Sequence, residues 1–353
     1  MFETTSRRNF LKSMTAVSVA TALGSRIDLT FADEKCSDVT VGMWGGDYQR
    51  LFDTYVTHSM VDAGKGGAIY AVADANTRVT KMRAELARRR GSIDVTCFSE
   101  TDMAEMNRIG ALEPLEIAQV PNAANTFAQL RTGYSIPQLY SGLVIVYNPD
   151  IVKEPPKSFK DCLDKKYQGQ VGFSDIIWSQ TGVAAALAAG DASGNLGSAP
   201  AFLTQLKDNK PKVFPSHEMV VAALKSGEIG ITWMWKARAV QWNKSGIKVE
   251  YVLPAEGLIP GVFQAGVAKN STNKKCAFEY LNALLEPKAQ VSFAESFGYA
   301  PTVTNSGIST ELLAQVGFSE DQLNNMIKID YAKQNEDKPQ FLEFWAKSFK
   351  AGL

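Results

Sequence analysis

The sequence has few of the residues that build catalytic or metal centres. Its 353 residues include only two histidines, His58 and His217. Four cysteines are present, none at metal or redox spacing: Cys36, Cys97, Cys162 and Cys276. The motifs G-x-S-x-G, H-E-x-x-H and G-x-x-x-x-G-K-S/T are absent. We therefore expect no enzyme, no metal site and no cofactor.

The chain also lacks net charge and long apolar runs. Lys and Arg number 37, against 37 Asp and Glu, so nothing favours nucleic acid or an anionic membrane as a partner. No apolar stretch after residue 32 is long enough to span a bilayer, so we expect a soluble product. Four cysteines permit three disulfide connectivities, and buried free thiols are equally compatible with the pattern.

The N-terminus has the composition of an export signal. Ser6–Lys12 contains a twin arginine, and the mild apolar run Met14–Leu23 follows it. Thr30 and Ala32 place small residues before a cut at Asp33. Residues 1–32 resemble a bacterial Tat signal peptide, which implies export of an already folded protein to the periplasm.

Strand-like and helix-like segments alternate along the rest of the chain. The expected strands are Asp38–Met43, Ala68–Ala73, Ser92–Phe98, Leu143–Tyr147, Val171–Phe173, Ile229–Trp235, Val249–Leu253 and Phe263–Ala268. This alternation predicts an α/β protein with open sheets, and the length predicts two domains or lobes. In such sheets ligands bind in the loops that follow strand ends.

One such loop lies within Gln170–Gly190. We expect a strand ending near Phe173, a polar turn at Ser179–Gly182, and an Ala-rich helix from Val183. Free N–H groups and hydroxyls at a helix start can hold an anion, although a capped helix without a ligand fits equally well.

Cations and aromatic residues follow a second strand. Lys236 and Arg238 come directly after Ile231–Trp235 and suit a carboxylate, phosphate or phosphonate. Because they are two residues apart, only one is expected to reach a ligand. Trp235 borders this polar loop, as Trp44 borders another, whereas Trp233 is expected in the core.

Several motifs occur in a fixed order. They are Trp44-Gly45-Gly46, the Asp94-Val95 strand, Lys157–Val171, Leu224–Gly230 and Ala265–Pro301. Together they resemble the bacterial extracellular solute-binding proteins of ABC importers, in the branch with polyamine-, ferric-iron- and phosphonate-binding members. The resemblance covers about Asp38 to Val303.

The resemblance implies the type II periplasmic-binding fold, in which two α/β lobes joined by two crossing strands hold ligand in a cleft. It places lobe 1 at residues 38–142 plus about 269–353, and lobe 2 at 149–263. Which lobe the tail beyond Val303 packs on stays open. The crossing strands are expected near 143–148 and 264–268. The implied partners are a small solute and an inner-membrane ABC permease, and we expect a monomer.

The expected ligand is a small organic anion. Polyamine-binding relatives place acids at positions that match Gly46, Ile176, Ser179 and Ala265, none of which is acidic. A buried dication without carboxylates would lack charge compensation. The adjacent tyrosine pair of ferric-iron binders is also missing. Two alternatives stay open: a cationic amine in an aromatic cage, and a secreted enzyme on the same fold.

The expected ligand-binding residues lie in the loops after strands and on the crossing strands. They are Trp44, Gly45, Gly46, Asp47, Ser99, Tyr140, Ser141, Trp178, Ser179, Thr181, Gly182, Trp235, Lys236, Arg238, Phe263 and Gln264.

Overall fold

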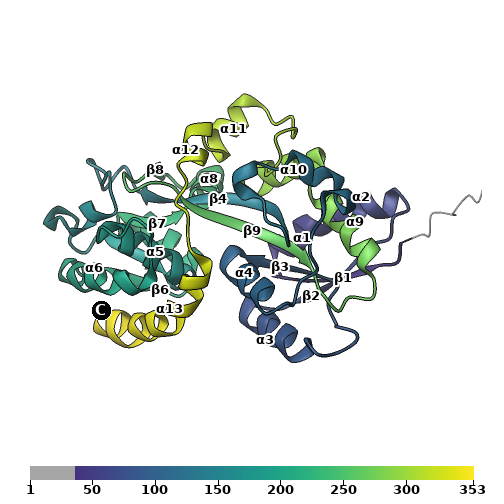
Figure 1. Ribbon diagram of the computed structural model, residues 1–353. Coiled ribbons are helices and arrows are strands. Elements are labelled where there is room, and N and C mark those ends of the chain that lie inside the picture. Colours follow the sequence, from purple (N-terminus) through teal and green to yellow (C-terminus); the bar gives the residue numbers. More distant parts are fainter. Residues whose placement is uncertain (1–35) are drawn as a thin grey trace, which may run out of the picture. The chain divides into compact units, whose positions relative to one another are not determined.

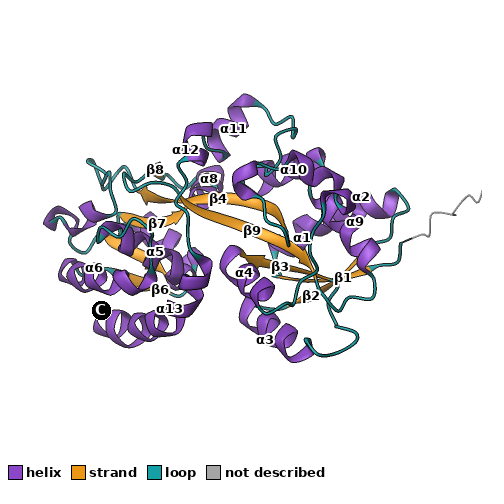
Figure 2. Ribbon diagram, in the orientation of Figure 1, coloured by secondary structure: helices purple, strands orange, loops and turns teal. Residues whose placement is uncertain are grey.

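The computed structural model describes residues 36–353, so the expected signal peptide (residues 1–32) lies outside the described residues. Strands and helices alternate as expected for an α/β protein (Figure 2). The strands are β1 Val39–Met43, β2 Ala68–Val72, β3 Val95–Ser99, β4 Ile136–Tyr147, β5 Val171–Ser174, β6 Lys212–Phe214, β7 Ile231–Trp235, β8 Glu250–Val252 and β9 Ile259–Val267.

The helices mostly follow strands. They are α1 Asp47–Phe52, α2 His58–Asp62, α3 Ala75–Glu85, α4 Glu100–Arg108, α5 Trp178–Ala188, α6 Ala199–Leu206, α7 His217–Ser226, α8 Lys236–Lys244, α9 Lys274–Leu284, α10 Pro287–Phe297, α11 Thr310–Val316, α12 Glu320–Asn324 and α13 Tyr331–Phe344.

The strands form one sheet in the order β2-β1-β3-β9-β4-β7-β5-β6, and β8 pairs with β4. In the first strand group, β1 is parallel to β2 and β3. In the second strand group, β5 is parallel to β6 and β7. The long antiparallel strands β4 and β9 run between the two groups (Figure 1).

The crossing strands are longer than the expected 143–148 and 264–268. Every residue of β4, Ile136–Tyr147, is buried, because the strand has neighbours on both sides and packing on both faces. The sequence prediction recognised only its most apolar part, Leu143–Tyr147. The residues before it, such as Gln138 and Ser141, are polar but are satisfied by internal hydrogen bonds.

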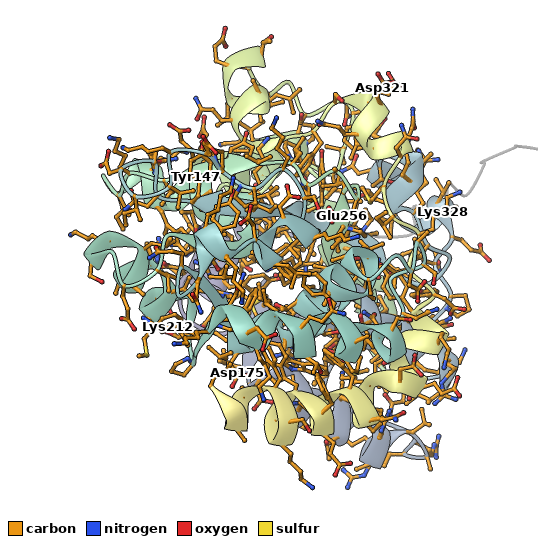
Figure 3. The ribbon with its side chains drawn as sticks, turned by 90° about the vertical axis from the view of Figure 1, so that its left-hand side faces the viewer. Tyr147, Asp175, Lys212, Glu256, Asp321 and Lys328 are labelled. Carbon is orange, nitrogen blue, oxygen red and sulfur yellow. A yellow bond between two sulfur atoms is a disulfide. The ribbon has the colours of Figure 1, made fainter. Side chains whose placement is uncertain are left out.

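The C-terminal segment contacts helices that follow both strand groups. Phe341 of α13 packs on Gly182 of α5. Trp345 donates to the Asp175 carboxylate through Nε1 (2.7 Å), and Lys350 does so through Nζ (2.6 Å). Figure 3 shows Asp175 beside this helical segment. The N-terminal half of α13 also bonds to α4, where Thr101 donates to Gln334.

The cysteines take two forms. Cys36 and Cys276 form a disulfide with a Cα–Cα distance of 5.4 Å, which ties the start of the described chain to α9. Cys97 and Cys162 are buried free thiols. Among residues 36–353, no helix is long and apolar enough to cross a membrane. The same residues contain no cluster of His, Cys, Asp and Glu that could hold a metal ion.

Candidate ligand-binding site

The two strand groups end opposite each other across the crossing strands. Ser99, at the end of β3, pairs with Phe263 of β9. Trp235, at the end of β7, pairs with Leu143 of β4, which pairs with Ile259 of β9. Four residues of β9 therefore separate the two ends, roughly 13 Å along the strand. We call the loops and helix starts that follow β1, β2, β3, β5, β6 and β7 the strand-end region.

Aromatic rings line the first side of this region. The Trp44 ring lies edge-on to Phe263, with centroids 5.5 Å apart, and to Tyr48 at 5.2 Å. Phe263 is in turn edge-on to Tyr299 at 5.5 Å. Trp44 and Phe263 are partly exposed, whereas Tyr48 and Tyr299 are buried behind them. The T-shaped contacts hold the exposed rings in fixed orientations.

A buried cation stands behind this wall. Arg78 of α3 is 1% exposed, and its guanidinium lies 4.7 Å from the Trp44 ring centroid and 5.0 Å from that of Phe98. It donates to the carbonyl oxygens of Ala73 and Cys97. Among the described residues no carboxylate forms an ion pair with it. Burial lowers the Arg78 pKa, but a guanidinium keeps its proton. Its positive charge is felt by the nearby carboxylates Asp102 and Asp74, neither of which is bonded to it.

A second guanidinium lies on the other side. Arg238 of α8 is partly exposed and donates from Nη1 to Gln241 at 2.9 Å, while its buried Nε has no hydrogen-bond partner in the described part of the chain. Burial and the charge of Arg238 lower the pKa of His217 to about 4. Burial raises the pKa of Tyr299, and Arg238 opposes that shift. Arg238 is thus close to His217, which follows β6, and to Tyr299, which follows α10.

Helix starts add to the positive potential. Because parallel strands are followed by helices, α3, α4, α5, α7 and α8 all begin in the strand-end region. Their unpaired N–H groups carry partial positive charge. Asp74 and Ser216 cap α3 and α7.

The carboxylates of this region are mostly engaged. Asp175 accepts from Trp345 and Lys350, and Asp47 is paired with Arg50 at 2.9 Å. Glu100 accepts from the Val262 amide at 3.2 Å, and burial raises its pKa to about 7. Glu218 is exposed, and its pKa is lowered by a hydrogen bond to its own backbone N–H, by Ser216 and by the charge of Arg238.

The structure divides the residues that the sequence suggested for the site. Nine are partly or fully exposed in the strand-end region or on its crossing strand: Trp44, Gly45, Gly46, Asp47, Ser99, Trp178, Ser179, Arg238 and Phe263. Seven are buried: Tyr140, Ser141, Thr181, Gly182, Trp235, Lys236 and Gln264.

Most of the buried residues have internal partners. Ser141 Oγ accepts from the Ala237 amide at 3.1 Å and so caps the start of α8. Gln264 Oε1 accepts from Ser135 at 2.8 Å. The Trp235 ring covers Gly261, where a Cβ would come within 2.4 Å of the ring. Tyr140 belongs to a separate apolar cluster, whereas Trp233, expected in the core, is confirmed there.

Lys236 is bonded within the protein. Its ammonium donates to the Gly317 carbonyl at 2.5 Å and lies 3.5 Å from that of Ala314, at the end of α11. Burial lowers its pKa to about 8. Of the two neighbouring cations, only Arg238 keeps donors free.

The expected turn at Ser179–Gly182 is wrong, because α5 already begins at Trp178. Strand β5 ends at Ser174, whose hydroxyl accepts from the Ile176 amide and starts a 3-10 turn that leads into the helix. Ser179 therefore lies in the first helical turn. Thr181 and Gly182 lie deeper in the helix, where Phe341 covers Gly182.

Sequence reasoning missed Arg78, His217 and Tyr299. His217 carried a usable signal, because Ser216 precedes it as a helix cap after a strand-like segment. Arg78 carried none, since a single arginine inside a polar helix is normally solvated.

The sheet order and the crossing strands define the type II periplasmic-binding fold. The chain belongs to the family described as bacterial extracellular solute-binding protein, whose sequence model matches residues 68–316. It is 24% identical over 251 residues to the spermidine/putrescine-binding periplasmic protein of Escherichia coli K12, covering 65% of this chain and 69% of that protein.

Solved structures share the fold. An ABC transporter protein from Clostridium perfringens superposes with a TM-score of 0.74 at 21% identity, covering 87% of this chain and 98% of the other. The Atu4243 GABA receptor superposes with a TM-score of 0.75 at 22% identity, covering 87% and 96%.

Proposed function

We propose that this protein is the periplasmic receptor of an ABC importer and that it binds a small organic anion between two lobes. Membership of the extracellular solute-binding family supports the receptor role. The receptor would deliver its solute unchanged to an inner-membrane permease, so it would not be an enzyme. It would act as a monomer. The twin arginine at Arg7-Arg8 supports export by the Tat route.

The observation that carries the choice of an anion is the Arg238 guanidinium. Among residues 36–353 its buried Nε has no hydrogen-bond partner, so a carboxylate or phosphonate that reaches it on closure would satisfy it. Arg78 adds a buried positive charge behind Trp44. Asp47 and Asp175, the acids closest to the positions used by polyamine binders, are already paired with cations.

Binding would close the strand-end region. The first strand group, with its helices, would act as one lobe, and the second strand group, with α13, as the other. Strands β4 and β9 join them and would serve as the hinge. A ligand that touches both Trp44 and Arg238 makes its full set of contacts only when the lobes approach, so it shifts the equilibrium toward closure.

The test is calorimetric titration of the mature chain with carboxylates, phosphonates, spermidine and putrescine. Anions should bind, and Arg238→Gln should weaken them about ten- to a hundredfold, as expected for a lost charged hydrogen bond. Arg90→Gln, at an exposed arginine beyond the far end of α3, is the matched control and should change nothing. Binding of polyamines but of no anion would refute the anion proposal.

A cationic or zwitterionic amine is the second candidate. Glu218 is exposed beside His217, and the E. coli relative is named for spermidine and putrescine. A γ-amino acid could place its carboxylate on Arg238 and its ammonium on Glu218. Under this alternative, Glu218→Gln weakens binding as much as Arg238→Gln does.

A further inference from the structure

Three large apolar side chains are exposed in the strand-end region. Val72 ends β2 and is 48% exposed, Ile176 follows β5 and is 57% exposed, and Met219 lies in the first turn of α7 and is 49% exposed. Exposed aliphatic surface of this size is unfavourable unless something covers it, at about 25 cal/mol per Å². We call these three residues the apolar rim.

The rim lies next to the aromatic and charged residues of the site. Val72 covers Gly45, where a Cβ would be 2.7 Å from its Cγ1, so it lies beside Trp44. Ile176 is two residues before the partly exposed Trp178, and Met219 is two residues after His217. Apolar surface is therefore contributed by both strand groups.

The polar part of the site offers one direct anchor. Nη1 of Arg238 is bonded to Gln241, so the Nε–Nη2 edge is the one that would match the two oxygens of a planar carboxylate. Its Nε is buried as the structure stands, so this pairing would form only as the lobes close. Arg78 is too buried to touch a ligand and contributes only its field. One bidentate anchor suits a single carboxylate better than a doubly charged phosphate.

Resting on the proposed anion receptor, we infer that the solute is a monocarboxylate with an apolar body. Arg238 holds the carboxylate, and closure buries the hydrocarbon part against Val72, Ile176, Met219 and the exposed rings of Trp44 and Phe263. The apolar rim thus determines specificity, because small hydrophilic anions leave it uncovered.

The experiment is calorimetric titration of the mature protein with acetate, butyrate, hexanoate, phenylacetate, methylphosphonate and hexylamine. Affinity should rise about fourfold for each buried methylene, and the heat-capacity change should become more negative with chain length. Ile176→Ser and Met219→Ser should each weaken hexanoate about three- to tenfold and leave acetate unchanged. Val61→Ser is the matched control, since Val61 is 53% exposed at the far end of α2.

The outcomes separate the two proposals. If carboxylates bind with the same affinity at every chain length while Arg238→Gln still weakens them, the apolar inference is overturned and the anion receptor stands. If hexylamine binds and no carboxylate does, the anion receptor fails. An equal loss in Val61→Ser, or no binding of any carboxylate, also overturns the inference. Melting temperatures of all variants check that the serine substitutions leave the fold intact.

Discussion

The helix starts of α5 and α8 look alike in sequence but differ in what they present. Each follows a buried strand and opens with polar residues, Ser179–Thr181 in one case and Lys236–Arg238 in the other. In α5 the side chain of Thr181 is fully buried. In α8 the side chain of Arg238 is partly exposed and donates from Nη1 to Gln241.

The difference comes from the point at which each helix begins. Helix α8 begins directly after β7, so Arg238 is its third residue and lies in the first turn. Helix α5 begins five residues before the expected Val183, so Thr181 is its fourth residue and Gly182 its fifth. A side chain reaches a ligand at strand ends only from the first turn, because neighbouring helices cover the later ones.

The largest loss of stability should come from adding a side chain at Gly182, where α5 packs against α13. A Cβ on Gly182 would lie 2.5 Å from the Phe341 ring and 2.7 Å from Leu196, so Gly182→Val should lower the free energy of unfolding by about 3 kcal/mol. Urea denaturation measures this change. Gly133→Val is the control, because a Cβ there meets nothing within 4 Å. Equal stability of Gly182→Val and the parent chain would show that α13 is not packed there.

Lys236 should make the free energy of unfolding depend on pH but should not contribute to ligand affinity. The folded-state pKa is about 8 and the reference value is 10.5, so between these pH values the unfolded chain holds more protons. Stability contributed by this group therefore rises with pH. Relative to Lys236→Met, the parent chain should gain about 2 kcal/mol from pH 7.5 to pH 10.

Denaturation of both proteins at each pH measures this difference, because other titrating groups cancel in the comparison. Carboxylate affinity at pH 7 should be the same in both proteins. A large loss of affinity in Lys236→Met would place its ammonium on the ligand and remove the contrast with Arg238.

Sequence patterns predicted the alternating architecture because buried strands such as Leu143–Tyr147 and Ile231–Trp235 are nearly continuous apolar runs. The motif order from Trp44 to Pro301 predicted the family, which the family match confirms. Apolar periodicity could not show the full length of β4, because Gln138 and Ser141 are buried polar residues whose partners are far away in the chain.

The candidate site was harder to predict than the fold. Whether Lys236 or Arg238 stays free depends on the carbonyls of Ala314 and Gly317, about 80 residues later. The burial of Gly182 depends on Phe341 of α13. Such distant contacts leave no local pattern, so residue type and spacing identified candidate loops but could not select among their side chains.

The start of a third helix, α4, carries a carboxylate, Glu100, in place of the hydroxyl of α5 and the cations of α8. Burial raises the Glu100 pKa to about 7, above the reference value of 4.5, so the folded chain holds the extra proton between these values. Its contribution to stability is therefore present at low pH and is lost as the pH rises through 7. Because Glu100 is only partly buried, the expected loss from pH 5 to pH 7.5 is about 1 kcal/mol relative to Glu100→Gln. If the free energies of unfolding of the two proteins differ by the same amount at every pH, this expectation is contradicted.

The smallest effect should come from Thr181→Val, which removes the hydroxyl first expected to hold the anion. Thr181 is fully buried, and its Oγ1 has no hydrogen-bond partner among residues 36–353. Removing this hydroxyl from water therefore costs free energy that no hydrogen bond offsets. Valine keeps the shape and should leave stability unchanged or raise it by up to about 1 kcal/mol. Carboxylate affinity should change less than twofold.

Thr101→Val is the matched control, because Thr101 is also buried near a helix start, in α4, but donates to Gln334 at 2.7 Å. There the same substitution leaves a buried acceptor unpaired and should cost about 1–2 kcal/mol. Urea denaturation and calorimetric titration of both variants test the pair. A tenfold loss of affinity in Thr181→Val alone would mean that the start of α5 reaches the ligand after all. The contrast with α8 would then reflect a rearrangement on closure, because Thr181 is fully buried as the structure stands.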